Sequence, residues 1–366
     1  GFRGNLQFLF SVKDPNRWDS DASNGFESDN DGSGTAAVPF TSAVWSNVTV
    51  IGPLRVDGSS LPAGSNHQDG LRIRRNSQLK IYNSIVMGFP NGVNVPDAVT
   101  GANAVNGTMV LKNTSIQATT AALKADASFA IATWFNAAGS SNLGGTNRAQ
   151  SALGLTDIGS LTNPDARPLP GSEPATAGTN FSDSPVAAAF FANVGYRGAF
   201  DPSKGRTQQW DFGWANYNPQ TTRYNIPVTV LGPGLGAGRT SYLQNSNRTL
   251  SKDTSYILTG IYIIDSTYSI TIPAGTQIQG DTVATLFVAR GGRVYANGTK
   301  EEPIVMTSRR PVGQRAAGDW GGVIILGAAP TNRATELFIE GGVGGLGGAV
   351  GTKAGYGGST PTDTSG

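Results

Sequence analysis

The stretch YILTGIYIIDSTYSITIPAGTQIQGDTVATLFVARGGRVYANGTKEEPIVMTS, residues 256–308, consists of short apolar runs interrupted by Gly, Pro, Asn or Asp. Such runs are typical of β-strands in a fold with many turns. Three strands shift together by about 25 residues, a period in the range of solenoids; the matched positions are Ile261 with Leu286, Ile270 with Val294, and Ile278 with Ile304. We therefore expect an all-β fold, a right-handed parallel β-helix (solenoid) with short covering helices and long loops.

The first third of the chain repeats this pattern more loosely. NVTVIG at 47–52 matches NSIVMG at 83–88, and LKIYNSI at 79–85 matches MVLKNTSI at 109–116. Unequal offsets are expected when loops of different length leave regular rungs. Two interpretations are open for the repeated asparagines: a ladder, in which each amide bonds its copy one rung away, or ordinary turn residues. These asparagines are Asn47, Asn83 and Asn113.

The composition excludes several classes of function. The chain has 366 residues, 50 of them Gly, no Cys, and a formal net charge of +2. The absence of Cys excludes disulfides, thiolate metal sites and a Cys nucleophile. The charge is too small to indicate a nucleic-acid partner, and no apolar run is long enough to span a membrane. A Cys-free, Gly-rich chain with few charges is common among exported bacterial surface proteins, so we expect an extracellular or cell-surface location.

The order of segments predicts four parts. We expect a β-helix body with loop insertions and capping helices over 1–231, a Gly-rich linker over 232–248, further rungs over 249–340, and a Gly-rich tail over 341–366. Two segments of the body have helical patterns, 122–138 and 184–194. We expect both helices to cover an edge or an open end of the solenoid.

An acidic stretch, RWDSDASNGFESDNDGSG at 17–34, is a candidate calcium loop. Calcium prefers six to eight oxygen ligands, and neighbouring glycines let backbone carbonyls turn inward. The EF-hand spacing is not met, so the loop would be irregular. The alternative is a solvated turn closed by Asx hydrogen bonds. The possible calcium ligands are Asp19, Asp21, Glu27, Asp29 and Asp31.

Catalysis receives less support from the residues. The chain lacks an adjacent Asp-Asp pair, and its one histidine, His67, is more typical of a loop than of a metal site or a triad. A lyase could use Arg72, Arg74 or Lys80 as a base beside calcium-bound carboxylates. These residues alternate with apolar ones, so solvated outward positions on a strand explain them better.

The chain resembles a family of secreted β-helix proteins from Bacteroidetes-like bacteria, of the hypothetical, lipoprotein or type IX secretion cargo type. The resemblance rests on SITIPAGTQIQGD, LFVARGGRVYANGTKEEPIVMTS and GDWGGVIILGAAPTN in the later part, and on WDSDASNGFESDNDGSG, RRNSQLKIYNSIVMGFPNGV and WDFGWANYNPQ in the earlier part. In such relatives the 249–366 type of segment comes first. The order here therefore corresponds to a permutation, a window across two tandem domains, or a subunit that completes itself with its neighbour.

These observations favour a non-enzymatic, secreted structural protein. We expect it to self-associate head to tail, as a subunit of an extracellular filament or surface layer, because open solenoid ends present unpaired strand edges. The alternative is a polysaccharide-binding or polysaccharide-lyase β-helix protein, with cell-surface polysaccharide as its partner. Fibres in negative stain would favour the first, and a lyase product from acidic polysaccharide would favour the second.

Overall fold

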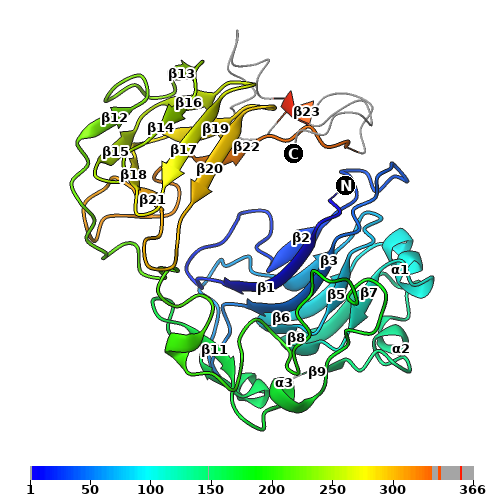
Figure 1. Cartoon of the computed structure of the whole chain (residues 1–366). Coiled ribbons are helices and arrows are strands. Elements are labelled where there is room, and N and C mark those ends of the chain that lie inside the picture. The colour runs from blue at the N-terminus through cyan, green and yellow to red at the C-terminus, as the bar shows by residue number, and fades with distance from the viewer. Residues whose placement is uncertain (1, 147, 332–336, 339–354, 357–366) are drawn as a thin grey trace. The chain divides into compact units, whose positions relative to one another are not determined.

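The computed structural model describes residues 2–146, 148–331, 337–338 and 355–356. The chain divides into two compact units, Gly1–Phe212 and Gly213–Gly366. Each unit is built mainly from parallel strands that stack in successive rungs (Figure 1). The predicted all-β parallel β-helix is therefore confirmed. Among the helices of the described residues, none has both the length and the apolar character that a membrane span requires.

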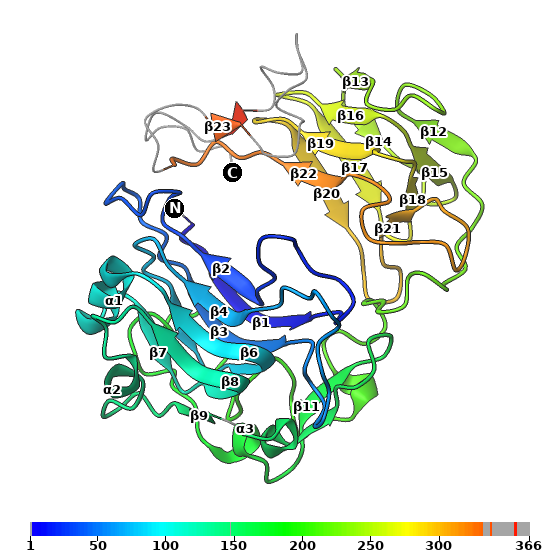
Figure 2. The ribbon, with the colours of Figure 1, turned by 180° about the vertical axis from the view of Figure 1, so that it is seen from behind.

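The first unit contains a nine-stranded sheet whose strand pairs are parallel (Figures 1 and 2). Its strands are β1 (Asn5–Val12), β2 (Phe26–Ser28), β3 (Val44–Ile51), β4 (Asp69–Ile73), β5 (Lys80–Tyr82), β6 (Ile85–Val95), β7 (Val110–Lys112), β8 (Ser115–Ala125) and β9 (Leu143–Thr146). Outside this sheet lie α1 (Ala98–Val105), α2 (Ile131–Phe135), α3 (Glu173–Thr176), the 3₁₀ turns η1 (Gln150–Leu153) and η2 (Arg206–Gln208), and the antiparallel pair β10 (Leu155–Asp157) and β11 (Asp165–Pro168).

The second unit has three parallel sheets, with strand orders β12-β15-β18-β21, β13-β16-β19-β22 and β14-β17-β20. Its strands are β12 (Thr229–Leu231), β13 (Ser241–Gln244), β14 (Arg248–Thr249), β15 (Ser255–Leu258), β16 (Ile261–Ile264), β17 (Ser269–Pro273), β18 (Gln277–Gly280), β19 (Thr285–Val288), β20 (Arg293–Asn297), β21 (Val305–Ser308) and β22 (Gly322–Ile325). An antiparallel pair, β23 (Leu337–Phe338) and β24 (Gly355–Tyr356), follows.

The strand register of the second unit confirms one of the three predicted matches. Ile270 pairs with Val294 as expected. Leu286, however, pairs with Tyr262, one residue beyond the predicted Ile261. A slip of one residue places Ile261 and Leu286 on opposite faces of their sheet. The third match is also wrong, by two residues, because Ile278 pairs with Met306 instead of Ile304. A shift of two residues leaves the predicted and the observed partner on the same face of the sheet.

The repeated asparagines of the first unit form a corner of the solenoid. Asn47, Asn83 and Asn113 occupy equivalent positions on successive rungs, with left-handed φ angles of 55°, 53° and 51°. Asn tolerates this conformation better than most residues. Of the two interpretations left open, the ladder of amides is wrong: Asn83 Nδ2 donates to the carbonyl of Asn180, and Asn83 Oδ1 accepts from the Asn180 N–H. The asparagine corner instead holds the segment around Asn180 by hydrogen bonds to its backbone.

The two predicted helices are largely absent. Residues 122–125 belong to β8, because Leu123 pairs with Val93 of β6, and only Ile131–Phe135 is helical. Segment 184–194 forms turns and bends in place of a helix. Its buried Val186 and Phe191 pack against Tyr82, so tertiary contacts decide its conformation.

The division into units differs from the expected linker. The boundary falls between Phe212 and Gly213, and the segment 232–248 contains β13, which pairs with β16. Its glycines serve the turn between rungs: Gly232 has a φ of 135°, and a Cβ there would lie 2.2 Å from the Thr259 carbonyl oxygen. Of the expected tail at 341–366, the structure describes only Gly355 and Tyr356, and the rest of that prediction lies outside the described residues.

Candidate functional site

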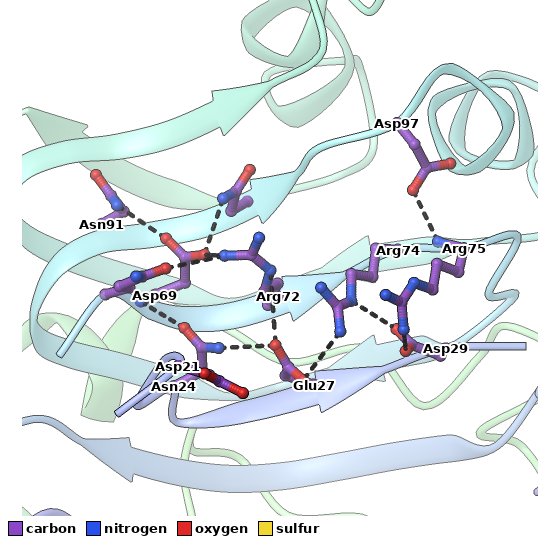
Figure 3. Close-up of polar contacts among 12 residues, drawn as sticks. Asp21, Asn24, Glu27, Asp29, Asp69, Arg72, Arg74, Arg75, Asn91 and Asp97 are labelled. Carbon is purple, nitrogen blue, oxygen red and sulfur yellow. Dashed lines mark hydrogen bonds and ion pairs between the residues drawn. The ribbon is translucent and has the colours of Figure 1, made fainter. Parts of the chain in front are cut away.

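The neighbouring strands β2, β4 and β6, with the residues that flank β2 and β4, carry a network of polar side chains (Figure 3). Leu71 and Ile73 of β4 point into the core, where they are 1% and 0% exposed, so Arg72 between them points outward. The parallel register places Arg72 opposite Glu27 on one neighbouring strand and opposite Asn94 on the other. We call this network the polar wall; its residues are Asn24, Glu27, Asp29, Asp69, Arg72, Arg74, Arg75, Asn91 and Asn94.

Asp69 is the centre of the polar wall. Its side chain is 1% exposed, and its Oδ2 accepts hydrogen bonds from Arg72 Nη1 at 2.9 Å and Asn94 Nδ2 at 2.8 Å. Its Oδ1 accepts from Asn91 Nδ2 at 2.8 Å. The Asp69 backbone N–H donates to Asn24 Oδ1 at 2.9 Å. A buried carboxylate with several donors of this kind fixes the side chains around it.

Ion pairs extend the network toward the end of β4. Arg74 contacts Glu27 at 3.3 Å and Asp29 at 2.9 Å, and Arg75 contacts Asp29 at 2.9 Å. Arg72 Nε lies 3.6 Å from Glu27 Oε1. The side chains of Glu27 and Arg75 are 39% and 41% exposed, whereas those of Arg72 and Arg74 are each 21% exposed. This end of the wall is open to solvent.

The formal charges of the polar wall cancel. Glu27, Asp29 and Asp69 face three arginines across the contacts just described. The ion pairs hold guanidinium and carboxylate groups side by side, with donors and acceptors in fixed positions. The wall therefore offers hydrogen-bonding groups without a strong net field.

The structure does not bring the five predicted calcium ligands together. Glu27 and Asp29 are paired with arginines of the polar wall. Asp19 and Asp21 are exposed, and Asp19 Oδ1 accepts from the Asp21 N–H at 2.9 Å. Asp31 is buried and closes a turn, where it accepts from the N–H groups of Ser33 and Thr35.

The arrangement of these five acidic side chains does not favour metal ligation. Across the part of the chain that the structure describes, no three His, Asp or Glu side chains gather so that they could hold one metal ion. Asx turns at Asp19 and Asp31, together with the arginine pairs of Glu27 and Asp29, account for the acidic stretch. Calcium binding stays a prediction, for which a rise in unfolding temperature with added calcium would be the evidence.

The three basic residues weighed as a catalytic base are separated. Arg72 and Arg74 lie on the polar wall, with carboxylates as partners. Lys80 lies on β5, which pairs with β3 and β7 and not with β4. Burial lowers the pKa of Lys80, whose Nζ donates to the Gln78 carbonyl at 3.2 Å. This arrangement places the guanidinium groups to hold charge and does not support a proton-abstracting role.

His67 lies just before β4, in a parallel bridge with Ser23. It is 4% exposed, and neither imidazole nitrogen has a hydrogen-bond partner among the described residues. Burial lowers the pKa of His67, while the Asp14 carboxylate and the Pro15 backbone oppose the shift. Its ring packs edge-on against Trp18, with 6.2 Å between the ring centroids. The predicted loop histidine is thus buried beneath an aromatic ring.

Sequence reasoning missed Asn24, Asp69, Asn91 and Asn94. A signal for three of them is present, because each precedes a glycine, in Asn24-Gly25, Asp69-Gly70 and Asn91-Gly92. These glycines face the core: a Cβ on Gly70 or Gly92 would lie 2.4 Å from a side-chain carbon of Val86 or Ile116. A recurring Asn/Asp-Gly dipeptide therefore marks a rung corner with a polar side chain outside and no room inside.

One comparison with known proteins gives a match. The family model described as a pectate-lyase-like beta helix domain matches residues 1–155 and 242–366, which is most of the chain and includes every residue of the polar wall. No curated protein and no solved structure matches the chain.

Proposed function

The chain belongs to the family of pectate-lyase-like β-helix domains, and from this premise we propose that it binds a neutral polysaccharide on the polar wall without cleaving it. The observation that carries the proposal is the charge-balanced row of partly exposed ion pairs beside the buried Asp69. Sugar hydroxyls both donate and accept hydrogen bonds, so they match a surface that presents carboxylates, amides and guanidinium groups side by side. An extracellular location would bring this surface to such polymers.

A neutral ligand fits better than an acidic one. Each arginine of the wall already contacts a carboxylate of the wall, so an incoming uronate would have to compete with Glu27, Asp29 or Asp69. That competition would leave one of these carboxylates unpaired, which costs free energy where the surface is partly buried. A neutral chain can add hydrogen bonds at the exposed edges without breaking an ion pair.

Catalysis by lyase chemistry would need a group that accepts a proton beside the sugar ring. The arginines nearest to such a role are ion-paired, and Lys80 lies on a strand that does not pair with β4. The ion pairs support a binding surface of fixed geometry instead.

Affinity electrophoresis tests the proposal. The protein is run in native gels that contain hydroxyethyl cellulose, galactomannan or polygalacturonate, and we expect retardation by a neutral polymer and none by polygalacturonate. The double variant Glu27→Ala/Arg74→Ala removes a contacting pair without changing the net charge. It should weaken binding by about tenfold or more, because hydrogen bonds to charged groups are among the stronger ones.

A matched pair serves as the control. Lys252 and Glu302 form an exposed ion pair at 3.2 Å in the second unit, and Lys252→Ala/Glu302→Ala should leave retardation unchanged. Equal migration of the wild type in all gels would contradict the proposal. Unsaturated product released from polygalacturonate would contradict the non-enzymatic part of it.

Self-association is a second candidate function, which the rung edges of the second unit support. Within the described residues, β22 pairs with β19 alone. Its Val323 and Ile325 take the inward register of Leu286 and Val288, yet they are 42% and 62% exposed. Such an end can template a further rung. We expect sedimentation coefficients to rise with concentration and Ile325→Glu to reduce the rise; monomers throughout would contradict this candidate.

A further inference from the structure

His67 is the single histidine of the chain, and it is buried beneath the loop that joins β1 to β2. We call residues 13–25 the β1–β2 loop. Its Trp18 ring packs edge-on against the imidazole, and neither imidazole nitrogen has a hydrogen-bond partner among the described residues. A neutral imidazole still carries one N–H donor, so the site holds a polar group away from water without a partner.

The charged groups that face His67 are Lys13 and Asp14, both on the β1–β2 loop. Asp19 of the same loop acts on Lys13, and Asp14 acts on Arg55, which follows β3. Burial and the Lys13 charge lower the pKa of His67, while a backbone carbonyl and Asp14 oppose the shift without outweighing burial. Asp, Lys and Arg ordinarily titrate outside the range from about pH 5 to 7.5, so within this group the imidazole is the side chain whose charge changes there.

The two halves of the β1–β2 loop are held differently. The later half is tied to Asn66, whose Nδ2 donates to the carbonyls of Ser20 and Asp21 at 2.8 and 2.6 Å. In the earlier half, the N–H groups of Asn16 and Arg17 donate to Asp14, within the loop itself. Residues 14–19 can therefore move away from His67 without breaking the hydrogen bonds of Asn66.

We propose that residues 14–19 form an acid-sensitive cover, which is closed over the neutral imidazole of His67 and opens when the imidazole takes up a proton. An imidazolium carries a full charge and two N–H donors, and it needs water where no partner is at hand. The cover does not depend on the proposed polysaccharide binding.

The direction of the pH dependence follows from the two protonation equilibria of His67. In the open loop the imidazole meets water and titrates near the ordinary histidine pKa of about 6.5, whereas burial lowers the pKa in the closed loop. Closure is therefore most favoured above about pH 6.5 and weakens as the pH falls, until the lowered pKa of the closed form is reached. If the closed form takes up no proton in this interval, the ratio of open to closed loop rises about tenfold from pH 7.5 to pH 5.5.

Amide hydrogen exchange of the full chain at pH 5.5, 6.5 and 7.5 tests the cover, with each rate divided by the intrinsic rate at that pH. The corrected exchange of residues 14–19 should rise about tenfold from pH 7.5 to pH 5.5. His67→Phe keeps a buried ring that takes up no proton, and it should abolish the rise. The loop between β10 and β11, residues 158–164, contains no histidine and is the internal control, whose corrected exchange should stay constant.

Proton NMR of the imidazole C–H signals gives the pKa of His67 directly, because no other histidine overlaps it. We expect a midpoint below 6.5 in the wild type and a return toward 6.5 in Trp18→Ala, which removes the ring of the cover. A wild-type midpoint at or above 6.5 would overturn the proposal. So would corrected exchange of residues 14–19 that is constant with pH, or that rises equally in a folded His67→Phe variant. If His67→Phe does not fold, the wild-type exchange and titration still decide.

Discussion

Replacement of Arg197 by alanine is expected to lower the free energy of unfolding of the first unit by about 3–5 kcal/mol. Arg197 is 0% exposed, and its guanidinium donates to the carbonyls of Gly178 at 2.9 Å, Ser141 at 2.8 Å and Ala177 at 3.0 Å. Truncation would leave these acceptors buried without a donor and would also open a cavity. Burial lowers the pKa of Arg197 to about 10, so the side chain remains charged at neutral pH.

The effect should concentrate in the segment that Arg197 holds. Residues 174–199 contain the Asn180 contact with the asparagine corner, and the Arg197 N–H donates to the Pro174 carbonyl at 2.9 Å. Urea unfolding gives the change in stability, and amide hydrogen exchange should show loss of protection in 174–199 before the rest of the unit opens.

Two further variants serve as comparisons for the stability of Arg197→Ala. Arg197→Lys keeps the charge but loses the planar fork of donors, so its stability should lie between those of the wild type and the alanine variant. Arg17→Ala removes an exposed arginine from the same unit and should change stability by less than about 0.5 kcal/mol. An Arg197→Ala protein as stable as Arg17→Ala would show that the segment is held by other contacts.

The fold could be predicted from the sequence because rungs repeat, but the register could not be read fully. The offset between Ile270 and Val294 was correct, since β17 alternates buried Ile270 and Ile272 with partly exposed residues. The offset between Ile261 and Leu286 was wrong, because β16 is buried on both faces. Where a strand is apolar at every position, a slip of one residue leaves no mark in the hydrophobic pattern.

The helices were overpredicted for a related reason. Apolar side chains at 184–194 suit an amphipathic helix, but Val186 and Phe191 are buried against Tyr82 in separate turns. At 122–125 the pairing of β8 with β6 prevails over local helical preference. Contacts between distant rungs decide these conformations, and they cannot be read from the segment alone.

The site was predicted in part. Glu27 and Asp29 were singled out as possible calcium ligands, and Arg72 and Arg74 as outward residues, but the ion pairs between them were not foreseen. The reason is sequence distance: Arg74 Nε reaches Asp29 Oδ1 across 45 residues, because the two lie on neighbouring rungs. A search for metal ligands within one acidic stretch considers only local neighbours. In a solenoid, the relevant neighbours are one period away.

Asp69→Ala is expected to have the second large effect, a loss of about 2–4 kcal/mol in stability together with loss of glycan binding. Its carboxylate satisfies Arg72, Asn91 and Asn94, and truncation would leave these donors without their acceptor in a buried place. Arg72 keeps its contact with Glu27 at 3.6 Å, so the loss should be smaller than for Arg197. Urea unfolding and affinity electrophoresis on the same preparations measure both effects.

A second aspartate on the same surface separates burial from charge. Asp29 also pairs with arginines, but its side chain is 26% exposed, against 1% for Asp69, so Asp29→Ala should cost about 1 kcal/mol or less. Asp69→Asn keeps an acceptor oxygen and the shape of the side chain, and should fall between the two. Equal losses for Asp29→Ala and Asp69→Ala would mean that the wall is held by its surface charges, and the central role of Asp69 would be wrong. A large loss at Asp69 alone would place the rigidity of the binding surface in its buried hydrogen bonds.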